Sequence, residues 1–279
     1  MFLILLFVCS CTNTEPEVVN RKLVVEGWIE NGEYPTVILT CSGVLDEEHT
    51  QVSDLVVRWG KVTLSDGDTT VTLIGGKDNR FFPAYSYRSY DMKGEPGKTY
   101  TLKAQYYGME VEAVSTMPTE IPVIKKVDVS YIDTIADIKL QIASSSSPRR
   151  YYQLFSCVDG QDKRYYPAFL GAITNEKAND ELLEATLYKG KSIQQKTFNS
   201  MFSVGHTVKY KVAQINEPEY NFWYDYQNLV NFNFSQFVTT SSKIQSNVKG
   251  GYGIWYAATV AKGEVVLDDK GGRRSEEGG

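Results

Sequence analysis

The sequence predicts an all-β protein made of two β-sandwich-like domains, Ig-like or barrel-like, the second carrying one α-helix near residues 217–232. Aromatic residues make up 13% of the chain and include 19 tyrosines, and tyrosine and threonine favour strands. Short segments alternate between apolar and polar residues, with turn residues between them. Hydrophobic residues make up 42% of the chain, which is enough for a buried core.

The predicted first domain spans residues 22–118 and is a series of short strands. We expect them at 22–29, 36–42, 56–66, 69–76, 100–106 and 109–116. The last two form the clearest pair, because Tyr107 and Gly108 provide a hairpin turn between two alternating segments. Pro118 and Pro122 interrupt a strand ladder, so they mark the boundary of the domain.

The predicted second domain spans residues 122–267. We expect strands at 123–132, 137–145, 151–160, 203–215 and 250–260, and a polar loop with one helical turn at 174–185. Residues 268–279 are polar and predict a disordered tail. No internal repeat is evident.

One helix is expected at 217–232. Asn216 can cap it, Pro218 lies in the first turn where a missing N–H is tolerated, and Glu219 completes a capping box. Tyr220, Trp223 and residue 226 then fall on one face, which indicates packing against the second sheet.

The N-terminus indicates export and lipidation. Residues 2–8 (FLILLFV) are too few to cross a bilayer but match the apolar core of a signal peptide. Val8-Cys9-Ser10-Cys11 is similar to a bacterial lipobox. We therefore expect a signal peptide at 1–10, lipidation of Cys11 and a tether at 11–21, although a buried strand with two cysteines is the alternative.

Charge and cysteine content argue against two features, a nucleic-acid partner and a disulfide. The net charge is −5 and no basic stripe is present, which argues against a nucleic-acid partner. Beyond the anchor only Cys41 and Cys157 remain, and their positions in different domains argue against a disulfide.

Residues for catalysis or metal binding are scarce. The chain has only two histidines, His49 and His206, and no GxSxG motif. The acidic run 46–48 lacks the glycine spacing of a calcium loop, so it indicates a solvated turn. We therefore predict no catalytic site, no metal and no cofactor, and a protein that is not an enzyme.

Two aromatic clusters are the candidate binding sites, FFPAYSYRSY at 81–90 and RYYPAF at 164–169. The candidate residues for binding a ligand or partner are Phe82, Tyr85, Tyr87, Arg88, Tyr165 and Tyr166. Exposed rings can stack on sugars or anchor a protein interface, whereas the alternative is that they fill a sandwich core. Pro83 and Pro167 favour loops, which often carry function.

Four segments together resemble one family: VVEGWIENGEYPTVILTCS, GEPGKTYTLKAQYYGMEVEAVSTMP, NEPEYNFWYDYQ and SNVKGGYGIWYAA. Their joint order along the chain resembles that of the bacterial domain-of-unknown-function 4249 family. The members of this family are lipoproteins of Bacteroidetes. The resemblance covers residues 22 to 260. It implies a lipid-anchored envelope protein, often encoded near a TonB-dependent outer-membrane receptor, and it supplies no catalytic residues.

The expected function is therefore binding. We expect a lipid-anchored protein of the cell envelope, at the outer membrane, that assists a TonB-dependent receptor in nutrient capture and binds a glycan or a peptide. An envelope hydrolase that uses carboxylates of the second domain and a purely structural envelope protein are the alternatives.

Overall fold

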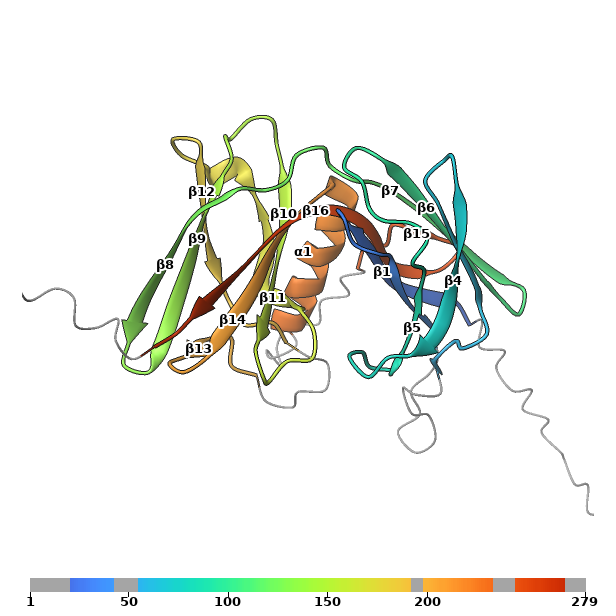
Figure 1. Ribbon diagram of the computed structural model, residues 1–279, viewed down its shortest axis with the longest axis horizontal. Coiled ribbons are helices and arrows are strands. Elements are labelled where there is room, and N and C mark those ends of the chain that lie inside the picture. The colour runs from blue at the N-terminus through green and yellow to red at the C-terminus, as the bar shows by residue number, and fades with distance from the viewer. Residues whose placement is uncertain (1–20, 43–54, 192–197, 233–243, 269–279) are drawn as a thin grey trace, which may run out of the picture.

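The computed structural model describes residues 21–42, 55–191, 198–232 and 244–268. These residues form mostly strands with one α-helix, which confirms the all-β prediction. Figure 1 shows two lobes side by side with helix α1 (Glu217–Phe232) between them. The predicted signal peptide, Cys11, the tether up to residue 20 and the tail from residue 269 lie outside the described residues.

The first lobe is a curled sheet around one core. Its strands are β1 (Leu23–Glu30), β2 (Thr36–Cys41), β3 (Lys61–Ser65), β4 (Thr70–Lys77), β5 (Tyr85–Arg88), β6 (Thr99–Tyr106), β7 (Met109–Thr116) and β15 (Val248–Lys249). Strand β7 packs across on β1 and β16, so the sheet folds over itself like a sandwich. Trp255 and Tyr100 are fully buried in this core, together with Leu23 and Leu102.

The second lobe has three layers. One sheet contains β8 (Ile124–Ile132), β9 (Ile135–Ala143), β12 (Leu182–Leu187) and β13 (Phe202–Ser203), and the other contains β10 (Tyr151–Val158), β11 (Tyr166–Thr174) and β14 (Thr207–Ile215). Apolar side chains of both sheets, such as Ile138 and Leu154, form the core between them. Helix α1 covers the other face of the second sheet, where Trp223 packs on Phe155.

Strand β16 (Tyr252–Val266) joins the two lobes into one sheet. Its first half pairs in parallel with β1, from Val24 opposite Tyr252 to Glu30 opposite Ala258. Its second half pairs antiparallel with β14. The result is a continuous path of strands, β11-β10-β14-β16-β1-β2-β5-β4-β3-β6-β7-β15, which does not close on itself within the described residues.

Helix α1 has the bounds that its capping signals predict. The N–H of Tyr220 donates to the Asn216 carbonyl at 3.0 Å, which starts the helix directly after Asn216. Within the described ranges no helix is long and apolar enough to cross a membrane.

Three local expectations differ from the structure. The segment 174–185 contains a 3₁₀ turn (Asn175–Lys177) as expected, but its end belongs to β12, which starts at Leu182. The aromatic segment at 85–88 is strand β5 rather than a loop, and Pro167 lies within β11. Pro167 is tolerated there because β11 is the last strand in the order of its sheet, with β10 as its strand partner and a single bridge from Ala168 to Gly190 on the other side.

Candidate functional site

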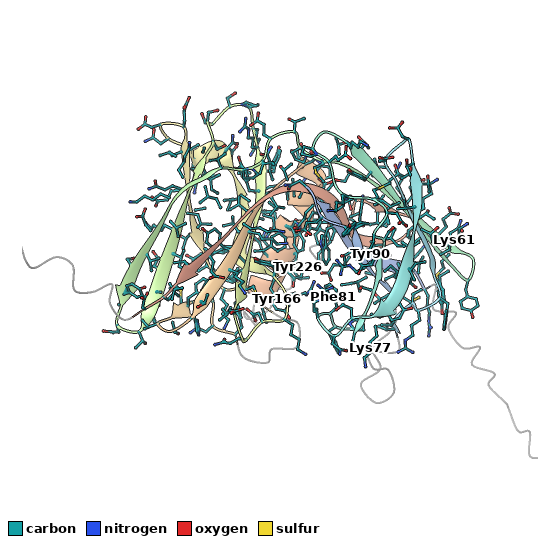
Figure 2. All side chains as sticks on the ribbon, in the orientation of Figure 1. Lys61, Lys77, Phe81, Tyr90, Tyr166 and Tyr226 are labelled. Carbon is teal, nitrogen blue, oxygen red and sulfur yellow. The ribbon has the colours of Figure 1, made fainter. Side chains whose placement is uncertain are left out.

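A groove of about 500 Å³ lies between the two lobes, and we call it the inter-lobe groove. Its walls come from the start of β1, the β4–β5 loop, the β10–β11 loop, one side of α1 and the start of β16. The lining residues used below are Glu26, Phe81, Phe82, Arg164, Tyr166 and Tyr226. Figure 2 labels Phe81, Tyr166 and Tyr226, which lie together between the lobes.

Aromatic rings from both lobes line the groove. Phe81 and Phe82 come from the loop between β4 and β5, and Phe82 is 40% exposed. On the opposite wall, α1 contributes Phe222 and Tyr226, whose rings stack with a centroid distance of 6.5 Å. A helix places residues four apart on the same face, so the order of aromatic residues in α1 directs both rings to this side.

Arg164 links the two walls of the groove. Its guanidinium forms an ion pair with Glu26 of β1 at 2.7 Å and lies 5.1 Å from the centre of the Phe81 ring and 5.2 Å from that of Tyr166. Burial lowers the pKa of Arg164, but the nearby charge and hydrogen bond of Glu26 outweigh it and raise the pKa. The arginine is therefore a fixed cation that joins the β10–β11 loop to the first lobe.

A side compartment of about 330 Å³ adjoins the groove and is lined by charged pairs. Lys211 of β14 is buried, forms an ion pair with Glu30, and lies 4.7 Å from the centre of the Tyr165 ring. Lys262 of β16 pairs with Glu33 at 2.7 Å, and its hydrogen bond lowers the pKa of that carboxyl. These pairs also connect the lobes, because Glu30 and Glu33 belong to the first and Lys211 to the second.

The structure brings four of the six candidate residues to this region. Phe82 and Tyr166 line the inter-lobe groove, and Arg88 and Tyr165 line the side compartment. The guanidinium of Arg88 lies 5.7 Å from the centre of the Tyr90 ring, and its Nε has no hydrogen-bond partner among the described residues. These four residues come from β5, β11 and the loops that precede them.

The other two candidates lie elsewhere. Tyr87 is 1% exposed, and its hydroxyl donates to the Val57 carbonyl and accepts from the Gly60 N–H, both at 2.9 Å. Burial raises its pKa to about 12. Tyr85 donates its hydroxyl to the Arg58 carbonyl at 2.9 Å. The alternative of core packing therefore applies to both, because residues two apart in a strand face the same side of the sheet, and Tyr85 packs against the same core as Tyr87.

Sequence reasoning missed the polar centre of the groove. Glu26 lies in an alternating strand segment, and nothing local distinguishes it from a solvated carboxylate. Arg164 and Phe81 are the first residues of the two aromatic clusters, so the clusters were a usable signal for them. The aromatic face of α1 was predicted, but its position opposite Phe81 depends on the tertiary fold.

Histidines, cysteines and metal ligands do not converge on this site. Among the described residues no three His, Cys, Asp or Glu side chains gather where they could hold a metal ion. The Nδ1 of His206 accepts the Ser203 N–H at 3.2 Å within a turn, and burial lowers the pKa of His206. Cys41 and Cys157 are both free and buried, in different lobes. His49 and the acidic run 46–48 lie outside the described residues.

Comparison with known protein families gives a match over most of the chain. A family described as a domain of unknown function (DUF4249) matches residues 12–264. No curated protein matches the chain. The matched range includes both lobes, the inter-lobe groove and the side compartment.

Proposed function

Because this chain belongs to the DUF4249 family, whose domain has no assigned function, we propose its function from its geometry: it is a binding protein whose ligand occupies the inter-lobe groove. The observation that carries the proposal is the groove itself, an aromatic cavity of about 500 Å³ between two lobes. Ligand pockets usually have about 300–1,000 Å³ and combine apolar walls with a few placed polar groups.

The composition of the walls favours a ligand with flat apolar faces and hydrogen-bonding edges. Phe82, Tyr166 and Tyr226 offer ring surfaces, and the Arg164–Glu26 pair offers donors and acceptors at a fixed position. A sugar or a short peptide has this combination of surfaces. The ligand class of the proposal is therefore a glycan or a peptide.

The carboxylates of the groove and of the side compartment support binding more than hydrolysis. Glu26 and Glu30 come from β1 of the first lobe, and each forms an ion pair with a cation, Arg164 or Lys211. Both carboxylates are therefore held by a cation of the other lobe, which gives them a structural role in joining the walls. An envelope hydrolase that uses carboxylates of the second domain gains no support from these two groups.

The proposal includes the cellular setting. Cys11 carries the lipid that holds the protein at the outer membrane, residues 12–20 act as a tether, and the partner is a TonB-dependent receptor. A tether increases the local concentration of the binding lobes near such a receptor, so weak contacts suffice for delivery of the ligand. Support comes from the lipobox-like N-terminus and from the family resemblance.

Binding to the groove is tested with a panel of soluble oligosaccharides and oligopeptides. Each panel member is titrated into the protein, and the heat of binding is measured by calorimetry. We expect Tyr226→Ala and Phe82→Ala to weaken binding of a panel ligand at least about tenfold, which is about 1.4 kcal/mol. Tyr224→Ala is the matched control, because Tyr224 is on the same helix but 45% exposed and outside the groove lining.

Two results would contradict the proposal. One is a panel ligand that binds the groove variants as tightly as the unmodified protein while Tyr224→Ala weakens binding. The other is steady conversion of a panel member to products, which would make the protein an enzyme.

A further inference from the structure

Two large aromatic side chains are almost fully exposed in the first lobe. Trp59 is 87% exposed and Tyr107 is 88% exposed. The neighbouring Tyr106 packs edge-on against Tyr107 with a centroid distance of 4.5 Å. We call these three residues the aromatic tip; they are separate from the inter-lobe groove, whose lining does not include them.

The strand register places the rings at one end of the lobe. Lys61 in β3 pairs with Gln105 in the antiparallel strand β6. Trp59 lies two residues before Lys61, and Tyr107 lies two residues after Gln105. Because β3 and β6 are antiparallel, moving backward along the chain from Lys61 and forward from Gln105 leads in the same direction in space. Both rings therefore extend beyond the same end of the sheet.

The N-terminal end of the described chain lies at this same end. Leu23 at the start of β1 pairs with Cys41 at the end of β2, and Thr40 of β2 forms a bridge with Val56, three residues before Trp59. In Figure 1 the start of β1 and the β6–β7 turn lie at the right-hand end of the molecule, and Figure 2 shows Lys61 there. The end of β16 lies at the opposite end.

We infer that the aromatic tip inserts into the interfacial layer of the lipid bilayer, as a second attachment beside the N-terminal anchor. This inference rests on the proposed lipidation of Cys11. Nine residues lie between Cys11 and Arg21, so Arg21 stays within about 35 Å of the lipid even at full extension of the tether. The aromatic tip lies at the same end of the first lobe as this start of the described chain. Trp and Tyr prefer the membrane–water interface, and a lipid anchor combined with a second attachment is more stable than one alone.

The attachment orients the molecule on the membrane. The first lobe lies against the bilayer, and the far end of the second lobe, with Ile132 75% exposed in β8, is directed away from it. The inter-lobe groove is then held at a defined height rather than sampling all positions that the tether permits.

Depth-dependent quenching of tryptophan fluorescence tests the inference. The full lipidated chain is reconstituted in vesicles of phosphatidylethanolamine and phosphatidylglycerol that contain lipids brominated near the headgroup. Of the four tryptophans, Trp59 is 87% exposed, Trp223 and Trp255 are buried, and Trp28 is partly buried in the side compartment, away from the tip. We expect brominated lipids to quench the emission, Trp59→Gln to lose most of this quenching, and the effect to persist at high salt, because it comes from ring insertion and not from charge.

A relocated reporter is the matched control. The double variant Trp59→Gln with Ile132→Trp carries an exposed tryptophan at the far end of the molecule, and we expect its emission to be insensitive to the brominated lipids. Equal quenching at position 132 would overturn the inference, because the molecule would then have no fixed orientation.

The remaining outcomes separate this inference from the proposed anchor. Mass spectrometry that finds no lipid on Cys11 overturns the anchor and this inference together. A lipidated protein that floats with the vesicles while Trp59 stays unquenched overturns only the inference. A shift of Trp59 emission that depends on protein concentration without vesicles also overturns it, because a second copy of the chain then covers the tip.

Discussion

Glu219 shows how one buried carboxyl fastens the helix to the first lobe. It is 1% exposed, its Oε1 accepts a hydrogen bond from the Ser115 hydroxyl at 2.7 Å, and its Oε2 has no hydrogen-bond partner among the described residues. The Ser115 hydroxyl in turn accepts the N–H of Ala257 at 2.9 Å. Burial raises the pKa of Glu219 above its ordinary value, because the ionised form loses its hydration.

Glu219→Gln is expected to change the pH dependence of stability. The folded protein keeps the proton of Glu219 to a higher pH than the unfolded chain, whose ordinary pKa is 4.5. The contribution of Glu219 to the free energy of unfolding is therefore fully present below pH 4.5. This stabilisation is lost as the pH rises through the raised pKa of the folded protein. The free energy of unfolding of the unmodified protein, relative to the variant, should fall over this range by about 1.4 kcal/mol per unit of pKa shift.

Urea unfolding at a series of pH values measures this difference. Glu217→Gln is the matched control, because Glu217 lies in the same first turn of α1 but is exposed. A relative stability that stays constant or rises with pH would show that Glu219 is ionised in the folded protein without penalty.

Among the secondary-structure elements, β16 has the strictest backbone requirement. It passes from the first lobe to the second and changes from a parallel partner, β1, to an antiparallel one, β14. Gly253 near its start has φ of 111° and contacts the backbone of Val25 so closely that an added Cβ would lie 1.9 Å from the Val25 carbonyl oxygen. Only glycine combines this conformation with this approach to β1.

Gly253→Ala is therefore expected to destabilise the protein by at least about 2 kcal/mol, from backbone strain and from separation of β16 and β1. Gly76→Ala in β4 is the control, because an added Cβ there meets no atom within 4 Å, and we expect a change below about 0.5 kcal/mol. Urea unfolding measures both. Similar stabilities of the two variants would contradict the role of Gly253.

For the whole molecule, the contacts between the lobes make them one structural unit. Strand β16 belongs to both, and the Arg164–Glu26 and Lys211–Glu30 ion pairs join them from side to side. Lys211 and Glu30 are both buried, so separation of the lobes would expose or leave unpaired two charges in a partly apolar setting.

We therefore expect the lobes to unfold in one transition. Trp255 in the first core and Trp223 beneath α1 report on different parts of the molecule. Urea unfolding followed by tryptophan fluorescence and by far-ultraviolet circular dichroism should give the same midpoint. Two separate midpoints would show that the lobes are independent despite the shared strand.

Local sequence signals were sufficient to predict many of the secondary-structure elements. The bounds of α1 follow from Asn216, Pro218 and the aromatic face, all of which lie within a few turns of one another. Strands such as β6 and β7 follow from alternation and a glycine turn. Strand β5 was missed because its aromatic sequence after Pro83 resembles a loop, and its partners β2 and β4 stabilise it from other parts of the chain.

The sequence by itself determined the all-β class, the helix at 217–232 and the aromatic segments that hold Phe82 and Tyr166. Only the tertiary structure decided that these rings share a groove with Glu26 and Arg164, because the ion pair joins residues 138 positions apart. The tertiary structure likewise placed Tyr87 in the core, whereas Phe81 and Phe82 of the same aromatic cluster line the groove. Periodicity and capping act over a few residues, whereas a site between two lobes depends on long-range pairing, here that of β16 with β1.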